Sequence, residues 1–453
     1  TLQSEEYRSS YLARERYAFE DVIHMLGELH EADQSKEYDL LAFEYVQRCK
    51  SRSFLDQMEN STPASTGKDD HYSAITASLK DVQKIIIDEN TVILEYSLGD
   101  SCSYLWIINR DTHKMIILPD RKTLHEQIET FRFSILNPKQ DNKTFLRQSG
   151  HKLYKHLIQP AEPFLSKKSN LVILPDGVLN DVPFQVLITD PPDKHPDQSF
   201  KELSYLVKKY PISYAQSSSV LVNLIQARKQ ETDSQQTPKD LIAFGDPVYK
   251  NKGSDNNFIG SEFKRLEYSG PEVEGIAGFF KDEMADIYVR ENASEENIKH
   301  NNSISDYRYI DFACHGLVDV KNPENSSLVV SLGNTSVEDG FLQASEISVL
   351  KLNADMVVLS ACETGLGKLI RGEGMIGLSR SFMYAGTPSL VVSLWSVSDI
   401  STSLLMREFY KNLTRKGLSK ADALQLTQIY MIKDEKYAHP FFWAPFVLTG
   451  DWK

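Results

Sequence analysis

The chain has 453 residues, more than one hydrophobic core usually supports, so we expect two folded units and an extension. Its 63 Asp and Glu residues outnumber its 50 Lys and Arg residues, and the net charge of -13 without a basic patch argues against a nucleic-acid partner. Apolar runs are too short to span a bilayer and no signal peptide is recognisable, which argues against a membrane partner. Four cysteines without paired or zinc-binding spacing favour a reducing, cytoplasmic compartment and predict no metal and no cofactor.

The first predicted elements are helices. Residues 4–57 are charged and helix-prone, with apolar side chains such as Leu40, Phe43 and Val46 at helical spacing. The segment 60–70 is rich in Ser, Thr, Asp and Gly and reads as a linker. We therefore expect a helical extension over residues 1–60.

An α/β unit is predicted next, over residues 75–235. Short β-rich runs alternate with helical patterns, which is typical of such a unit. The expected strands are 92–96, 104–108, 114–118 and 171–174, and the expected helices are 125–133 and 218–228. The polar segment 230–237 marks its boundary.

A second α/β unit is predicted over residues 236–453. Four apolar runs, each followed by a segment long enough for a crossover, indicate a mostly parallel sheet covered by helices. These strands are 241–244, 309–313, 356–359 and 390–394, and a helix near Pro271 would turn Val273, Ile276, Ala277 and Phe280 inward. Sites in such sheets form at the carboxyl ends of the strands.

Two of these strands end in reactive side chains. His315-Gly316 follows the strand 309–313, and Cys362 follows the strand 356–359. His315 precedes Cys362 by 47 positions, in agreement with the caspase pattern of a histidine about 50 residues before the nucleophile. Neighbouring parallel strands would bring imidazole and thiol to one sheet edge, so the two residues are predicted to form a catalytic dyad.

The chemistry follows from these residue types. A free thiol with a pKa of about 8.5 needs a neighbouring imidazole to become a useful nucleophile at neutral pH. Attack on a peptide carbonyl creates an oxyanion, for which the Gly316 and Cys362 amides are the predicted hole. The alternative is a buried core cysteine and a structural histidine. Their joint position at two strand ends favours the dyad, whereas Cys314 is expected to be a core residue.

An ordered series of motifs resembles the CHAT domain family, a group of caspase- and separase-related peptidases that are fused behind tetratricopeptide repeats. The motifs are Leu-Pro-Asp-Gly and Val-Pro-Phe within 171–186, the His315 and Cys362 segments, Gly372 to Phe382, Ser393 to Asp399, His439-Pro440, Trp443 to Phe446, and Gly450. Glu363-Thr364 departs from true caspases, so cleavage after aspartate is not expected.

The resemblance implies a three-layer, caspase-like α/β fold with an inactive first half and an active second half. It implies a cysteine endopeptidase that forms a thioester with one specific protein substrate, in bacterial antiviral defence or cell-death signalling. The substrate would be a latent pore former or toxin. Residues 4–57 would be the remnant of a repeat array, and an activator would bind through the upstream repeats.

The resemblance also implies a substrate pocket. Asp399, with Trp395 and Ser396, matches a position that in separase-like relatives receives a basic residue before the scissile bond. The alternative is that Asp399 caps the helix that begins there.

A glycine-rich loop after the nucleophile is predicted to order on activation. It contains Gly365, Gly367, Arg371 and Glu373. The Gly-Lys-Ser/Thr ending of a phosphate-binding loop is missing, which argues against a nucleotide-binding module. The main alternative to the peptidase is a catalytically silent caspase-like scaffold.

Overall fold

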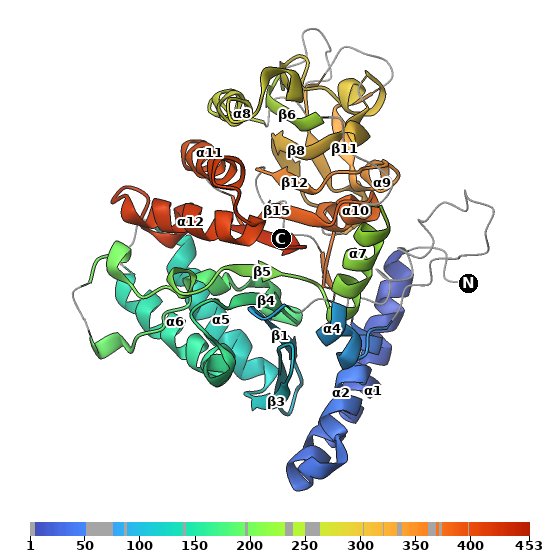
Figure 1. The fold of residues 1–453 in the computed structure, drawn as a ribbon, viewed down its shortest axis with the longest axis vertical. Helices are drawn as coiled ribbons and strands as arrows, with labels where there is room; N and C mark the ends of the chain where they lie inside the picture. Colours follow the sequence, from blue (N-terminus) through green and yellow to red (C-terminus); the bar gives the residue numbers. More distant parts are fainter. Residues whose placement is uncertain are drawn as a thin grey trace, which may run out of the picture. The chain divides into compact units, whose positions relative to one another are not determined.

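The computed structural model describes two compact units (Figure 1). The first is Thr1–Glu231 with Leu369–Gly374, and the second is Thr232–Lys368 with Met375–Lys453. The described residues are 5–50, 76–85, 88–138, 142–194, 198–231, 239–249, 263–301, 303–319, 321–332, 338–360, 368–370, 374–396 and 398–453. Within these ranges, no helix combines the length and the apolar character that a membrane crossing requires.

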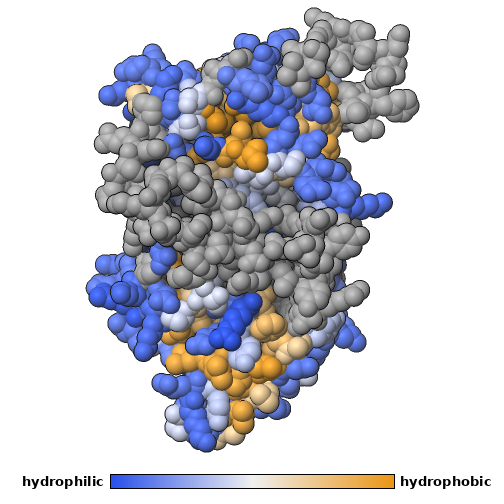
Figure 2. Space-filling view, turned by 90° about the vertical axis from the view of Figure 1, so that its right-hand side faces the viewer, coloured by the Kyte–Doolittle hydropathy of each residue, from blue (hydrophilic) through white to orange (hydrophobic). Residues whose placement is uncertain are grey.

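The first unit begins with two long helices, as expected. Helix α1 spans Glu5–Ala32 and helix α2 spans Tyr38–Cys49. Helix α2 buries Phe43 and Val46, two of the apolar positions that the helical spacing marks, and also Ala42, whereas the third marked position, Leu40, is half-buried. Apolar residues also remain exposed on this helix pair, among them Met25, Leu29 and Leu41, and Figure 2 shows apolar surface where Figure 1 places α1 and α2.

Five paired strands form the centre of the first unit, and all four predicted strands are confirmed. Their order is β3-β2-β1-β4-β5, with β1, β2 and β3 antiparallel and β1, β4 and β5 parallel. The strands are β1 (Thr91–Ser97), β2 (Ser103–Ile108), β3 (His113–Leu118), β4 (Asn170–Leu174) and β5 (Ile212–Tyr214). Helices α5 (Arg121–Leu136) and α6 (Lys143–Leu157) lie on one side, and α4 (Leu79–Ile85) and α7 (Ser218–Glu231) lie on the other (Figure 1).

The second unit has a sheet in the order β16-β15-β12-β8-β6-β7. The four predicted strands are confirmed and parallel, whereas β7 and the antiparallel strand β16 were not predicted. The bounds are β6 (Lys239–Pro247), β7 (Ala285–Arg290), β8 (Tyr307–Ala313), β12 (Met356–Leu359), β15 (Ser389–Ser393) and β16 (Phe446–Gly450). Strands β8 and β12 are neighbours, as the dyad hypothesis requires.

Helices cover both faces of this sheet, so the unit has three layers (Figure 1). One face carries α8 (Ser269–Ala277), α11 (Asp399–Arg415) and α12 (Lys420–Lys433), and the other carries α9 (Ala344–Ile347) and α10 (Leu378–Tyr384). A short helix, α13, spans Pro440–Trp443. Helix α8 ends at Ala277 with Gly278 as its C-cap, so Phe280, which was predicted to face inward from this helix, lies beyond its end.

Two small sheets are also present. Strands β9 (His315–Leu317), β10 (Ser327–Val329) and β11 (Phe341–Gln343) form an antiparallel sheet in the order β11-β10-β9. Strands β13 (Lys368–Ile370) and β14 (Gly374–Ile376) form a two-stranded sheet. The sequence did not predict β9, because a three-residue strand carries no periodic pattern.

Candidate active site

His315 lies at the carboxyl end of β8, where the chain passes into the small sheet. Cys314, which lies between the end of β8 and His315, is fully buried, and this confirms the prediction that it is a core residue. His315 and Gly316 belong to β9, where they pair with Val329 and Leu328 of β10. The predicted histidine is therefore held by two sheets, and its side chain is half-buried.

The imidazole of His315 has a defined orientation. Its Nε2 lies 2.7 Å from the carbonyl oxygen of Lys264, an acceptor that requires a proton on Nε2 and leaves the lone pair of the neutral ring on Nδ1. The rings of Tyr249 and Phe263 pack against the imidazole, with centroids 5.1 Å and 5.5 Å away. The His315 backbone N–H donates to the Tyr249 hydroxyl over 3.3 Å.

Asp246, at the end of the neighbouring strand β6, organises the segment that carries this carbonyl. Its carboxylate accepts two hydrogen bonds from Arg265, of 2.8 Å and 2.7 Å, and one from Arg290 of 3.1 Å. Its backbone N–H donates to the Ser269 hydroxyl over 2.8 Å. Burial opposes the charge of this carboxyl, but the two guanidinium groups more than offset that and lower its pKa.

Strand β12 ends at Leu359, and Ser360 leads toward the predicted nucleophile. The Ser360 N–H donates to the carbonyl of Phe312 on β8, over 3.1 Å, so the two strands stay paired to their ends. Cys362 lies outside the described residues, as do Gly365, Gly367, Arg371 and Glu373 of the predicted loop. The pairing of Cys362 with His315 therefore stays a prediction.

Two buried acids lie beneath these strand ends. The Ser360 hydroxyl donates to Glu272 over 2.8 Å, and neither Asp311 oxygen makes a hydrogen bond of ordinary geometry to a described residue, although the Tyr410 hydroxyl is close. Burial raises the pKa of Asp311 to about 7, and the Tyr410 hydroxyl opposes this shift. Burial and the charge of Asp311 raise the pKa of Glu272 well above its usual range.

The predicted substrate-pocket residues have different environments. Asp399 is half-buried at the start of α11, where Ser398 is the N-cap, and its carboxylate accepts the Tyr268 N–H over 2.8 Å at the start of α8. Burial raises the pKa of Asp399, while the Tyr268 N–H and nearby His315 act against that shift. Trp395 is buried and donates its indole N–H to the Phe441 carbonyl over 3.1 Å, whereas Ser396 is exposed.

A second cysteine and histidine meet in the first unit. The Cys102 sulfur lies 3.4 Å from His24 Nδ1 and 3.2 Å from the Tyr104 hydroxyl, beside a cavity of about 60 Å³. Burial raises the pKa of the Cys102 thiol, and the charges of Glu28 and Glu31 add to the shift. A nucleophilic cysteine needs the opposite shift, so this pair is not a candidate catalytic site.

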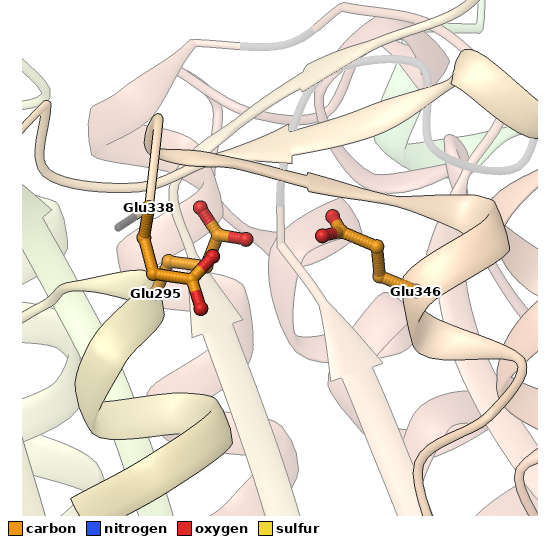
Figure 3. A group of neighbouring side chains, drawn as sticks. All are labelled: Glu295, Glu338 and Glu346. Atoms are coloured by element: carbon orange, nitrogen blue, oxygen red, sulfur yellow. The ribbon is translucent and has the colours of Figure 1, made fainter. Parts of the chain in front are cut away.

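Three carboxylates in the second unit lie close enough to hold a cation: Glu295, Glu338 and Glu346 (Figure 3). Lys299 already fills this role. Its Nζ is 2.5 Å from Glu295, 2.9 Å from Glu338 and 2.5 Å from Glu346. The ammonium group satisfies all three acids, so the cluster is an internal ion network that joins the segment after β7 to β11 and α9.

Comparison with known proteins decides the family. The CHAT domain family model matches residues 147–451, more than half of the chain. The chain belongs to the CHAT domain family. Tetratricopeptide repeat protein 28 from human is 30% identical over 114 residues, and its mouse counterpart is 29% identical over 109 residues. Those matches cover 25% and 24% of this chain but only 4% of each relative.

The fold of this CHAT domain protein is similar to that of part of separase. The structure of the Saccharomyces cerevisiae separase-securin complex superposes with a TM-score of 0.53 and 11% identity, over 92% of this chain and 34% of that chain. The described part is thus a caspase-like α/β fold with a mostly parallel sheet between helices. At 11% identity, the likeness shows the fold and not the activity.

Several residues of this CHAT domain site were not predicted. Asp246 and Arg265 are 19 positions apart, and Glu272 and Asp311 are contributed by different elements. An acidic residue in the Gly245-Asp246-Pro247 turn, at a strand tip, was the one available signal. No sequence signal could have identified the Lys264 carbonyl as the partner of His315, because every residue has a backbone carbonyl.

Proposed function

We propose that this CHAT domain protein is a cysteine endopeptidase with Cys362 as nucleophile and His315 as its acid-base partner. One observation supports it most: His315 is oriented through its Nε2–H by the Lys264 carbonyl, at the end of the strand that pairs with the one leading to Cys362. A histidine whose tautomer is set by a fixed acceptor is suited to proton transfer at its other nitrogen.

The reaction uses this orientation. Nδ1 of His315 accepts the thiol proton of Cys362, and the sulfur attacks the peptide carbonyl carbon. The amides of Gly316 and Cys362 stabilise the oxyanion, and His315 returns the proton to the leaving amine. Water then attacks the thioester, releases the acyl product and restores the thiol.

Selective labelling tests this proposal. The wild-type protein is incubated with a peptide chloromethyl ketone, and modified cysteines are located by mass spectrometry. We expect label at Cys362, lost in Cys362→Ala and strongly reduced in His315→Gln, with Cys49, Cys102 and Cys314 as internal controls. Equal labelling of wild type and His315→Gln would favour the scaffold alternative. A search of lysate for proteins that wild type cleaves and Cys362→Ala does not would then identify the substrate.

We also propose that Asp399 receives an Arg or Lys side chain of the substrate. Its carboxylate is half-buried and is paired with no cationic side chain in the described ranges. Asp399→Asn tests this sharply, because the amide oxygen can still accept the Tyr268 N–H. We expect labelling by Arg or Lys electrophiles to fall at least about 10-fold, with neutral electrophiles and thermal stability unaffected. Equal losses for both classes would assign Asp399 to helix positioning.

Regulation through upstream repeats is part of the proposal. Two observations support it. The human and mouse relatives are named as tetratricopeptide repeat proteins. Within the first unit, Lys50, which directly follows α2, donates a hydrogen bond to the buried Glu95 of β1. An activator bound to such repeats could act through this helix. A dedicated protein substrate, such as a latent pore former or toxin in defence or cell-death signalling, follows from the family resemblance.

A further inference from the structure

We infer that Asp246 is a positioning residue for His315 and acts through Arg265, which sets the backbone segment whose Lys264 carbonyl holds the imidazole. The inference rests on the proposed function, because it assigns the residues that prepare the acid-base group of that site. Neither Asp246 nor Arg265 reaches the reacting atoms in this scheme.

Asp246 is built into the end of β6 as a fixed acceptor. Strand β6 pairs in parallel with β8, with Gly245 opposite Ala313, so Asp246 lies beside the point where β8 turns toward His315. Its side chain is 8% exposed, and its φ of 46° is a left-handed conformation that few non-glycine residues adopt. The backbone bond to Ser269 on α8 holds this conformation.

Arg265 links Asp246 to the chain segment that carries the Lys264 carbonyl. Its guanidinium makes a bidentate pair with Asp246, the geometry that restricts both distance and orientation. Lys264 directly precedes Arg265, so the pair restrains the chain one residue from the oxygen that accepts the His315 Nε2–H. If this restraint is lost, the imidazole loses its defined acceptor and both tautomers become accessible.

Arg290 provides a matched control within the same cluster. It bonds the same carboxylate over 3.1 Å from the end of β7, but it belongs to a different element and is far in sequence from Lys264. Both arginine side chains are partly exposed, 57% for Arg265 and 40% for Arg290. A purely structural role of Asp246 would make the two arginines equivalent, whereas positioning makes them unequal.

The first experiment reads the tautomer of His315 directly. Full-length protein with ¹⁵N-labelled histidine is measured by NMR, and the His315 signals are identified by their loss in His315→Gln. We expect an Nε2–H tautomer in wild type and Arg290→Gln, and a shift toward a tautomer mixture in Arg265→Gln and Asp246→Asn. Asparagine tolerates the left-handed conformation, so Asp246→Asn keeps the backbone. An unchanged tautomer in both Asp246→Asn and Arg265→Gln would overturn the inference.

The second experiment measures the rate of Cys362 labelling in the same variants. We expect Arg265→Gln and Asp246→Asn to be slower by about 10-fold to 100-fold, as for a misplaced catalytic group, and Arg290→Gln by no more than about 2-fold. Equal rates for the two arginine variants, at matched melting temperatures, would reject positioning. If wild-type Cys362 is not labelled at all while the tautomer follows Arg265, the peptidase proposal fails and the positioning of His315 stands.

Discussion

The two units bury acidic side chains in their sheets in opposite ways. In the first unit, Glu95 on β1 is fully buried and lies 3.2 Å from the ammonium of Lys50, which also donates to the carbonyls of Tyr96 and Leu174. The other Glu95 oxygen accepts the Ser218 hydroxyl over 2.5 Å. This acid has a charge partner and hydrogen bonds at both oxygens.

In the second unit, Glu272 and Asp311 are buried as two acids, and neither forms an ion pair with a described residue. Two carboxylates cannot both be charged at low cost in such a place, so burial favours a proton on the pair. The first arrangement fastens the helical extension to a sheet through a buried ion pair. The second makes the region beneath the candidate active site sensitive to pH.

Removal of Lys50 should have the largest effect on stability. Lys50→Met leaves Glu95 buried without its counter-ion, and we expect a loss of about 3–5 kcal/mol in the free energy of unfolding. Urea unfolding of the full chain, wild type and Lys50→Met, measures this loss in the free energy of unfolding. The matched control is Arg110→Met, which removes the exposed pair with Glu89 and should cost less than about 1 kcal/mol. A Lys50→Met variant as stable as the control would show that Glu95 is not dependent on its partner.

Asp311→Asn should have the next largest effect, and it should depend on pH. The pKa of Asp311 is raised in the folded state, so the contribution of this group to stability is fully present below about pH 4 and is lost as the pH rises toward 7. Asparagine mimics the neutral acid at all pH values. At pH 8 the variant should be more stable than wild type by about 2–4 kcal/mol, and near pH 4 the difference should vanish.

Urea unfolding at pH 4, 5, 6, 7 and 8 measures this slope. Asp282→Asn, at an exposed position of the same unit, is the control and should keep the wild-type dependence on pH. If Asp311→Asn keeps the wild-type slope as well, the buried acids do not retain a proton.

Lys299→Ala should have an intermediate effect, because Lys299 is partly exposed. The change leaves Glu295, Glu338 and Glu346 facing one another, and we expect a loss of about 2–3 kcal/mol. Three carboxylates without their lysine offer oxygen ligands to Ca²⁺. The melting temperature of the variant should therefore rise with added calcium chloride, while wild type and the exposed-pair control Lys411→Ala should not respond. A calcium response in wild type would contradict the role given to Lys299.

Ser360→Ala should have the smallest effect, about 1 kcal/mol. It removes the hydroxyl that donates to Glu272 over 2.8 Å and leaves the backbone pairing of β8 and β12 in place. Because that hydrogen bond lowers the pKa of Glu272, the loss should be larger at pH 8 than at pH 5. Thermal unfolding at both values checks it, with Ser345→Ala at an exposed position as control.

Central strands were predictable because they consist of short apolar runs. Strands β1, β2, β4, β6, β8, β12 and β15 are buried along nearly their whole length, so composition alone marks them. Strand β7 was missed because it is half-exposed and carries charged ends. Helix α8 was drawn too long because its inward-facing pattern continues past Gly278.

The candidate site was predictable only in part. His315 and Cys362 stood out because their side chains are reactive and follow strands, and the order of motifs identified the family that the comparison confirms. The partners of His315 were missed, since Tyr249 and Phe263 look like ordinary aromatic residues in a polar segment. Trp395 was assigned to a pocket, and that assignment stays a prediction; its indole is buried and donates to the Phe441 carbonyl.

Local residue patterns were sufficient to establish the class of fold, the strands at its centre and the two side chains on which the proposed chemistry depends. They act over a few neighbouring residues, and a strand or a reactive terminus is visible at that range. Pairings such as Asp246 with Arg265, Lys50 with Glu95 and Glu272 with Asp311 join elements distant in the chain. Only the folded chain decides these, because burial and distance set the charge of a carboxyl and the orientation of an imidazole.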